Sequence, residues 1–129
     1  MNKCISNEIN TVCWQGKADG YLEILDQTKL PTQITYIVCK DVPAVIESIK
    51  SLRVRGAPAI GIAGAYGMVL AVQSATLIKD SWEKKLAYIR QRAEDLATAR
   101  PTAVNLRWAI QRIERLIAFL SLYFISVNM

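Results

Sequence analysis

The chain has 129 residues, of which 52% are hydrophobic and 21% charged, so it can form one domain with a real core and is too apolar to be disordered. It contains no histidine, which excludes imidazole acid–base catalysis and His-ligated zinc within this chain. The formal net charge of +5 is a weak bias towards anionic partners.

The cysteines give an expectation about the compartment. Cys4, Cys13 and Cys39 are odd in number and lack C-x-x-C spacing, which argues against a disulfide framework or a zinc knuckle. We therefore expect reduced thiols. The first residues also contain no apolar signal segment. Together these observations predict a cytoplasmic protein.

Residues 1–40 are predicted to form strands and turns. Runs rich in β-branched and aromatic residues occur at 11–14, 21–25 and 33–39, and turn-forming residues separate them. This pattern predicts a small antiparallel sheet of two or three strands at the start of the chain.

Residues 41–115 are predicted to be helical. Asp41 is a good N-cap, with Pro43 in the first turn of a helix. A second helix is expected over 58–74, a third after Ser81, and a fourth from Pro101. The fold class is therefore α+β, with a bundle of four to five helices behind the sheet, in a single domain spanning 1–129. Residues 116–129 form an apolar tail, which predicts a surface that binds a partner.

Two stretches raise the question of other partners. Residues 56–78 carry no charge and could span a bilayer, but Gly61, Gly64 and Gly67 favour a buried core helix instead. Residues 90–115 contain six arginines, yet no nucleic-acid recognition motif accompanies them, so a solvated helix face with ion pairs is the favoured interpretation. We expect neither a membrane nor a nucleic acid as partner.

The sharpest local feature is the stretch VRGAPAIG at 54–61. Pro58 suits the first turn of a helix, and Gly56 permits unusual backbone geometry before it. The amides of Gly56 and Ala57 could then face one anion at the positive end of the helix, with the Arg55 guanidinium beside it. The alternative is a plain helix start with an exposed arginine.

A second stretch, ARPTAVNL at 99–106, places Arg100 directly before the helix predicted from Pro101. Two such junctions in one small domain suggest that Arg55 and Arg100 converge on a single anionic ligand. The spacing alone leaves open whether the two arginines meet in space.

These two stretches, together with LDQTKLP at 25–31, resemble in order and spacing the signature segments of methylthioribose-1-phosphate isomerase. That family belongs to a wider group with ribose-bisphosphate isomerases and the regulatory subunits of the guanine-nucleotide-exchanging translation initiation factor. The resemblance covers about residues 12–112. It implies an aldose–ketose isomerase of methionine salvage that interconverts 5-methylthioribose 1-phosphate and 5-methylthioribulose 1-phosphate.

The resemblance also implies site residues and partners. Arg55, Gly56 and Ala57 would contact the phosphosugar substrate, and Arg100 would help to hold its phosphate. It implies no cofactor and a homodimer. Asp26, within the third stretch, is interpreted as a turn or capping carboxylate.

The chain departs from the family in one large respect. Members have a second, Rossmann-like domain that holds their catalytic Cys and Asp, and we find no counterpart here, so no catalytic residue is assigned. The departure is consistent with a truncated or frameshifted reading frame or with a naturally divergent end, and enzyme activity of this chain alone is not expected. The alternative function is a non-catalytic protein-interaction module like the initiation-factor regulatory subunits.

Overall fold

The computed structural model describes residues 10–127. The described chain begins with three strands, β1 (Val12–Gln15), β2 (Tyr21–Leu25) and β3 (Tyr36–Cys39), with a short 3-10 helix, η1 (Gln27–Lys29), between the last two. Four α-helices follow: α1 (Val42–Lys50), α2 (Ala57–Thr76), α3 (Trp82–Ala97) and α4 (Val104–Val127). The α+β class and the sheet-then-helices order predicted from the sequence are confirmed.

The strands form an antiparallel meander in the order β1-β2-β3. Leu22 pairs with Cys39, and Ile24 pairs with Ile37. Alternation along β2 buries Leu22 and Ile24 completely while Glu23 is only partly covered, as expected for a sheet with one face on the core. Strand β3 is three residues shorter than predicted because the Gln33 amide donates to the Lys29 carbonyl, 3.0 Å away, and keeps that backbone in a turn.

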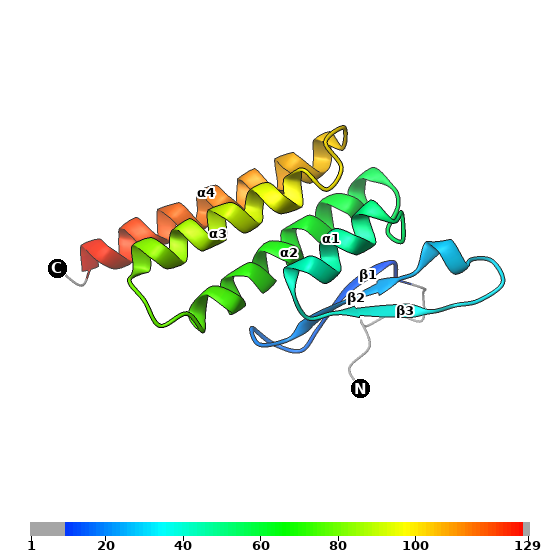
Figure 1. Cartoon of the computed structure of the whole chain (residues 1–129), viewed down its shortest axis with the longest axis horizontal. Helices are drawn as coiled ribbons and strands as arrows, with labels where there is room; N and C mark the ends of the chain where they lie inside the picture. Colours follow the sequence, from blue (N-terminus) through cyan, green and yellow to red (C-terminus); the bar gives the residue numbers. More distant parts are fainter. Residues whose placement is uncertain (1–9, 128–129) are drawn as a thin grey trace.

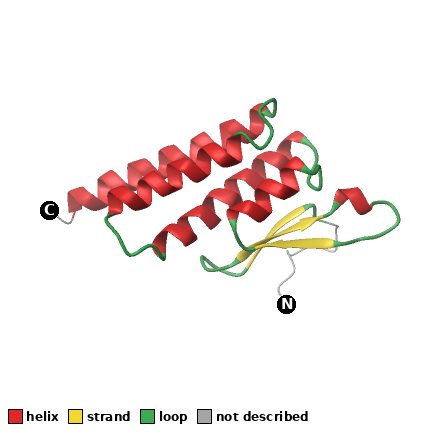
Figure 2. Cartoon of the chain, in the orientation of Figure 1, coloured by secondary structure: helices red, strands yellow, loops and turns green. Residues whose placement is uncertain are grey.

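The molecule is layered (Figures 1 and 2). The sheet lies against α1 and α2, and α3 and α4 lie on the other side of these helices. Helix α2 is in the middle and contacts all three other helices and two strands. It is long and apolar enough to cross a membrane, but half of its most apolar stretch is buried inside the fold. This burial agrees with the expected core helix.

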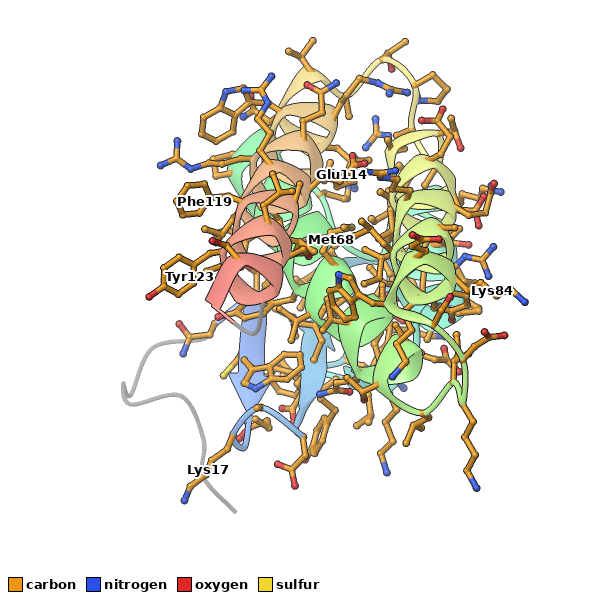
Figure 3. The ribbon with its side chains drawn as sticks, turned by 90° about the vertical axis from the view of Figure 1, so that its left-hand side faces the viewer. Lys17, Met68, Lys84, Glu114, Phe119 and Tyr123 are labelled. Atoms are coloured by element: carbon orange, nitrogen blue, oxygen red, sulfur yellow. The ribbon has the colours of Figure 1, made fainter. Side chains whose placement is uncertain are left out.

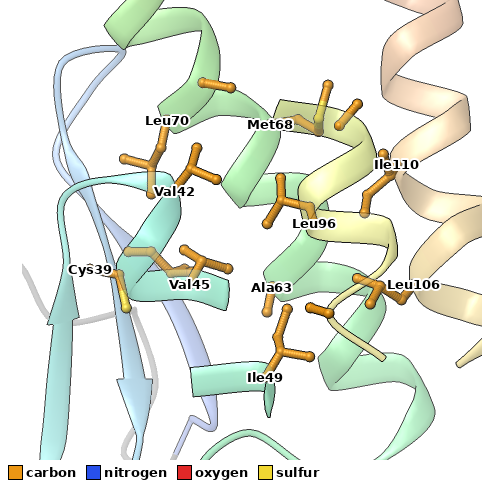
Figure 4. Close-up of a cluster of buried hydrophobic side chains, with 14 of the residues drawn as sticks. Cys39, Val42, Val45, Ile49, Ala63, Met68, Leu70, Leu96, Leu106 and Ile110 are labelled. Atoms are coloured by element: carbon orange, nitrogen blue, oxygen red, sulfur yellow. The ribbon is translucent and has the colours of Figure 1, made fainter. Parts of the chain in front are cut away.

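The core joins all layers at one place (Figure 4). Cys39 reaches it from β3, Val45 from α1, Met68 from α2, Leu96 from α3 and Ile110 from α4. Cys39 is a free, buried thiol, and burial raises its pKa, although the Ser48 hydroxyl nearby acts in the opposite direction. Cys13 is disulfide-bonded, so the expectation of reduced thiols is wrong for that residue.

Capping side chains set two helix starts as the sequence predicted. The Asp41 carboxylate accepts from the Ala44 amide at 3.0 Å, and the Ser81 hydroxyl accepts from the Lys84 amide at 3.3 Å. Each bond satisfies an amide that has no partner within its helix. The apolar tail predicted over 116–129 is, as far as Val127, the second half of α4.

The start of α4 was predicted wrongly. The helix begins at Val104, three residues after Pro101. The Ala103 amide donates to the Arg100 carbonyl at 2.9 Å, which closes a tight turn with Pro101 at its second position. Proline suits that position of a turn as well as the first turn of a helix, and the sequence pattern does not distinguish the two.

Candidate functional site

The first candidate segment connects α1 to α2. Gly56 is the N-cap of α2 with φ 91° and ψ 136°, and no side chain caps the helix. Proline occupies the first turn, as predicted. Since capping side chains are absent, the amides of the first turn are left for solvent or a ligand, and the helix dipole favours an anion there.

The space around this segment is open. Arg55, Gly56 and Ala57 are all exposed, and a Cβ added at Gly56 would meet nothing within 4 Å. Within residues 10–127, the Arg55 side chain has no ion-pair partner, whereas Arg53, two residues earlier, is held by two carboxylates. The positive charge of Arg55 is therefore not neutralised by the fold.

Arg100 lies in the turn between α3 and α4 and is partly buried. Because α4 begins at Val104, Arg100 does not directly precede a helix, and the expectation of a second helix N-terminus at Arg100 is wrong. Its guanidinium also has no ion-pair partner among the described residues. Arg92 and Arg107 differ, since they pair with Asp95 and Glu94 at 2.9 and 3.6 Å, as expected for a solvated helix face.

The starts of α2 and α4 lie at the same end of the molecule (Figure 1). A Cβ at Gly61 would lie 3.3 Å from the Asn105 carbonyl oxygen, so the two helices approach closely near their first turns. The structure thus brings the loops that contain Arg55 and Arg100 to one end of the helical layers. Convergence of the two guanidinium groups on one ligand stays a prediction.

An apolar groove of about 620 Å³ lies between α2 and α4 beside this end. Neither Arg55 nor Arg100 lines this groove. Its walls include Ala57, Pro58, Gly61, Ile62, Trp108 and Ile113. Trp108 is 60% exposed there, with the Arg112 guanidinium 5.4 Å from its ring centroid. Sequence reasoning did not predict this groove, because its shape depends on how the two helices pack.

A third cluster was only partly foreseen. Asp26 caps η1, as its turn interpretation predicted, but its carboxylate also pairs with Arg53 at 2.9 Å. Burial opposes ionisation of Asp26, yet hydrogen bonds from Thr28 and the Arg53 guanidinium hold its pKa below the ordinary value. Arg53 also pairs with Glu47 at 3.1 Å, and these carboxylates raise its pKa. The sequence did not predict the Asp26–Arg53 pair, because the two residues are 27 positions apart.

Comparison with known proteins places this architecture in a family. The profile of the initiation factor 2 subunit family matches residues 53–123, which is more than half of the chain and includes Arg55, Gly56, Ala57 and Arg100. The chain belongs to this family.

Curated relatives narrow the comparison to one enzyme. Over 108 residues the chain is 50% identical to methylthioribose-1-phosphate isomerase of Pelotomaculum thermopropionicum, covering 83% of this chain and 28% of the relative. Over 107 residues it is 46% identical to the protein of the same name from Desulforamulus reducens, covering 81% and 29%. The resemblance predicted from the sequence is confirmed, and the chain spans less than a third of these relatives' length.

Two solved structures share the fold. The 5-methylthioribose 1-phosphate isomerase of Pyrococcus horikoshii OT3 is 35% identical with a TM-score of 0.76, over 88% of this chain and 30% of that one. The delta subunit of translation initiation factor eIF-2B from A. fulgidus is 37% identical with a TM-score of 0.72, over 81% and 29%. An enzyme and a translation factor subunit thus share the fold of this chain.

Proposed function

We propose that this chain is the substrate-contacting N-terminal part of a methylthioribose-1-phosphate isomerase and that it holds the phosphate of 5-methylthioribose 1-phosphate. Identity of 50% to a relative of that name supports the assignment most strongly. The open start of α2, which has no side-chain cap, supports the role given to residues 55–57, as does the Arg55 guanidinium, which has no ion-pair partner among the described residues.

Each group has a physical task in this proposal. The amides of Gly56 and Ala57 face the phosphate oxygens at the positive end of α2. Arg55 supplies a forked donor from the loop, and Arg100 supplies another from the α3–α4 turn. Holding the phosphate fixes the sugar for proton or hydride movement between its first two carbons. The groups that carry out that movement lie, by resemblance, outside this domain, and we expect no turnover from the 129-residue chain alone. Localisation in the cytoplasm and assembly as a homodimer also stay predictions.

The test is a calorimetric titration of 5-methylthioribose 1-phosphate into the chain and two double variants. Arg55→Ala/Arg100→Ala removes the proposed phosphate donors. Arg90→Ala/Arg115→Ala removes the same charge from exposed positions on α3 and α4. A hydrogen bond to a charged group contributes about 1.5–3 kcal/mol, so losing both donors should weaken binding by at least about a hundredfold.

Three outcomes contradict the proposal. The unsubstituted chain fails to bind the ester, both double variants lose affinity equally, or the purified chain turns over substrate. The second outcome would show a general effect of positive charge rather than a site.

A non-catalytic interaction module is the second candidate. Phe119, Leu122 and Tyr123 on α4 are each more than 60% exposed, and the fold is shared with the eIF-2B delta subunit. An exposed apolar face of this kind is typical of protein interfaces. No phosphosugar binding, combined with clear self-association in sedimentation, would favour this module over the isomerase.

A further inference from the structure

The arginine two residues before Arg55 is clamped from two directions. Its Nη1 donates to Asp26 at 2.9 Å, and its Nε lies 3.1 Å from both carboxylate oxygens of Glu47. Asp26 comes from the segment after β2, and Glu47 comes from α1. Two carboxylates neutralise this guanidinium, so Arg53 is a poor candidate for binding an anion itself.

The Asp26 end of the clamp is rigidly built. The Asp26 side chain is 3% exposed, and its Oδ1 accepts from the Thr28 amide at 3.0 Å and from the Thr28 hydroxyl at 2.5 Å. Its own amide donates to the Thr35 carbonyl at 2.8 Å. A buried carboxylate whose two oxygens are both hydrogen-bonded has little freedom to move, so Asp26 can hold the Arg53 guanidinium in one position.

The backbone around Arg53 is held as tightly as its side chain. The Gln27 amide donates to the Arg53 carbonyl at 2.9 Å, and the Arg53 amide donates to the Ser48 carbonyl at 2.9 Å. Val54, the next residue, is fully buried. The residue before Arg53, Leu52, has φ 60°, a conformation that persists only where surrounding contacts impose it.

Beyond Val54 the next backbone hydrogen bond is at the start of α2, where the Gly56 carbonyl accepts from the Ile60 amide at 3.0 Å. Arg55 and Gly56 are exposed, and α2 begins at Ala57. The short segment 55–56 is therefore held between the Arg53 clamp on one side and the first turn of α2 on the other. Only one residue, the buried Val54, separates the clamp from Arg55.

We propose that Asp26 and Arg53 are positioning residues that set the place of the Arg55 guanidinium and the Gly56 backbone at the start of α2. The consequence for ligand affinity rests on the proposed phosphate-holding role of residues 55–57. The effect on the order of the segment does not depend on any ligand.

The first measurement uses the free chain. Asp26→Asn keeps the shape and the bonds from Thr28 but removes the charge that holds Arg53. NMR relaxation should show the backbone order parameters of Arg55 and Gly56 falling from about 0.85 to below about 0.6. The order parameters of α3 and α4 should stay unchanged.

The second measurement is a double-mutant cycle on titration with 5-methylthioribose 1-phosphate. Asp26→Asn should weaken binding by about tenfold in the unsubstituted chain and by less than about twofold in the Arg55→Ala background. If the two substitutions weaken binding independently, Asp26 acts only on general stability, and the proposal is overturned.

Two further variants make the test decisive. Asp95→Asn breaks the exposed pair with Arg92 for the same charge change and should alter neither readout. Glu47→Gln removes the exposed half of the clamp and should reduce the order parameters of Arg55 and Gly56 by less than Asp26→Asn does. It replaces Asp26→Asn in the test if that variant fails to fold. If Asp26→Asn folds, or Glu47→Gln in its place, and the order parameters of Arg55 and Gly56 are unchanged, the proposal is overturned. Failure of the unsubstituted chain to bind counts against the proposed function alone, since the order parameters report the positioning role without ligand.

Discussion

At the scale of single residues, Gly56 is the position where backbone geometry and the candidate site coincide. Its φ of 91° lies in the half of conformational space that side chains disfavour, yet the space around it is empty. The requirement for glycine therefore comes from the backbone and not from crowding. The same openness leaves room for a ligand against this backbone.

Replacing Gly56 with alanine should destabilise the chain by about 1–3 kcal/mol through backbone strain alone. It should also weaken binding of 5-methylthioribose 1-phosphate, because relief of the strain moves the amides of the site. Urea unfolding and calorimetry measure the two effects. Gln111→Ala, at an exposed position on α4, should stay within about 0.5 kcal/mol of the unsubstituted chain. A Gly56→Ala variant as stable as that control would show that this φ is not required.

Asp26 gives a prediction about acid. Its folded pKa lies below the ordinary value of 3.8, so it stabilises the fold fully above that value. The contribution disappears as pH falls from 3.8 through the lower folded pKa. The difference in Tm between the unsubstituted chain and Asp26→Asn should therefore be large at pH 6 and shrink below pH 3.8. Asp95→Asn should lower Tm less at pH 6, because its ion pair is exposed. An Asp26→Asn difference that is independent of pH would contradict this account.

At the scale of elements, the close approach of α2 and α4 depends on small residues. A Cβ at Gly64 would lie 2.5 Å from Leu106 Cδ1 and 3.4 Å from Ile110 Cγ1, and both of these side chains are buried. The glycines that reduced helix propensity in the sequence thus have a packing reason: they let the central helix approach its neighbour.

Gly64→Val should destabilise the fold by about 2–3 kcal/mol, because three added carbons overpack a full core. Ile62→Val, on the same helix but 49% exposed, should cost less than about 0.5 kcal/mol. Chemical denaturation of both variants measures the difference. If Gly64→Val and Ile62→Val are equally stable, α4 shifts readily to accommodate the added carbons, and the groove between α2 and α4 is easily deformed.

Sequence reasoning succeeded for elements with local signals. Asp41 and Ser81 cap their helices as predicted, because a capping side chain acts on amides only a few residues away. It failed at Pro101, because proline is favoured both at the second position of a turn and in the first turn of a helix. It identified residues 55–57 and 100 as site candidates, but not the Arg53 clamp, whose two partners come from different elements.

At the scale of the whole molecule, the packing of the layers leaves an apolar surface exposed on the second half of α4. Figure 3 shows Phe119 and Tyr123 pointing away from the rest of the bundle, from the second half of α4. Leu116, Leu120 and Leu122 on the same helix are each more than half exposed. The sequence showed that this stretch is apolar, but the direction of an apolar side chain is set by the packing of α4 on α2 and α3.

This α4 surface should make the isolated chain associate as its concentration rises. Removing apolar area from water is favourable by about 25 cal/mol per Å², and nothing within the described chain covers these side chains. Phe119→Glu/Leu122→Glu should abolish the concentration dependence of the apparent mass in sedimentation equilibrium. Leu77→Glu/Ile34→Glu places the same charges on exposed apolar residues away from α4 and should leave association unchanged. A chain that stays monomeric at high concentration, or a control pair that is equally effective, would show that the α4 surface has no special part in association.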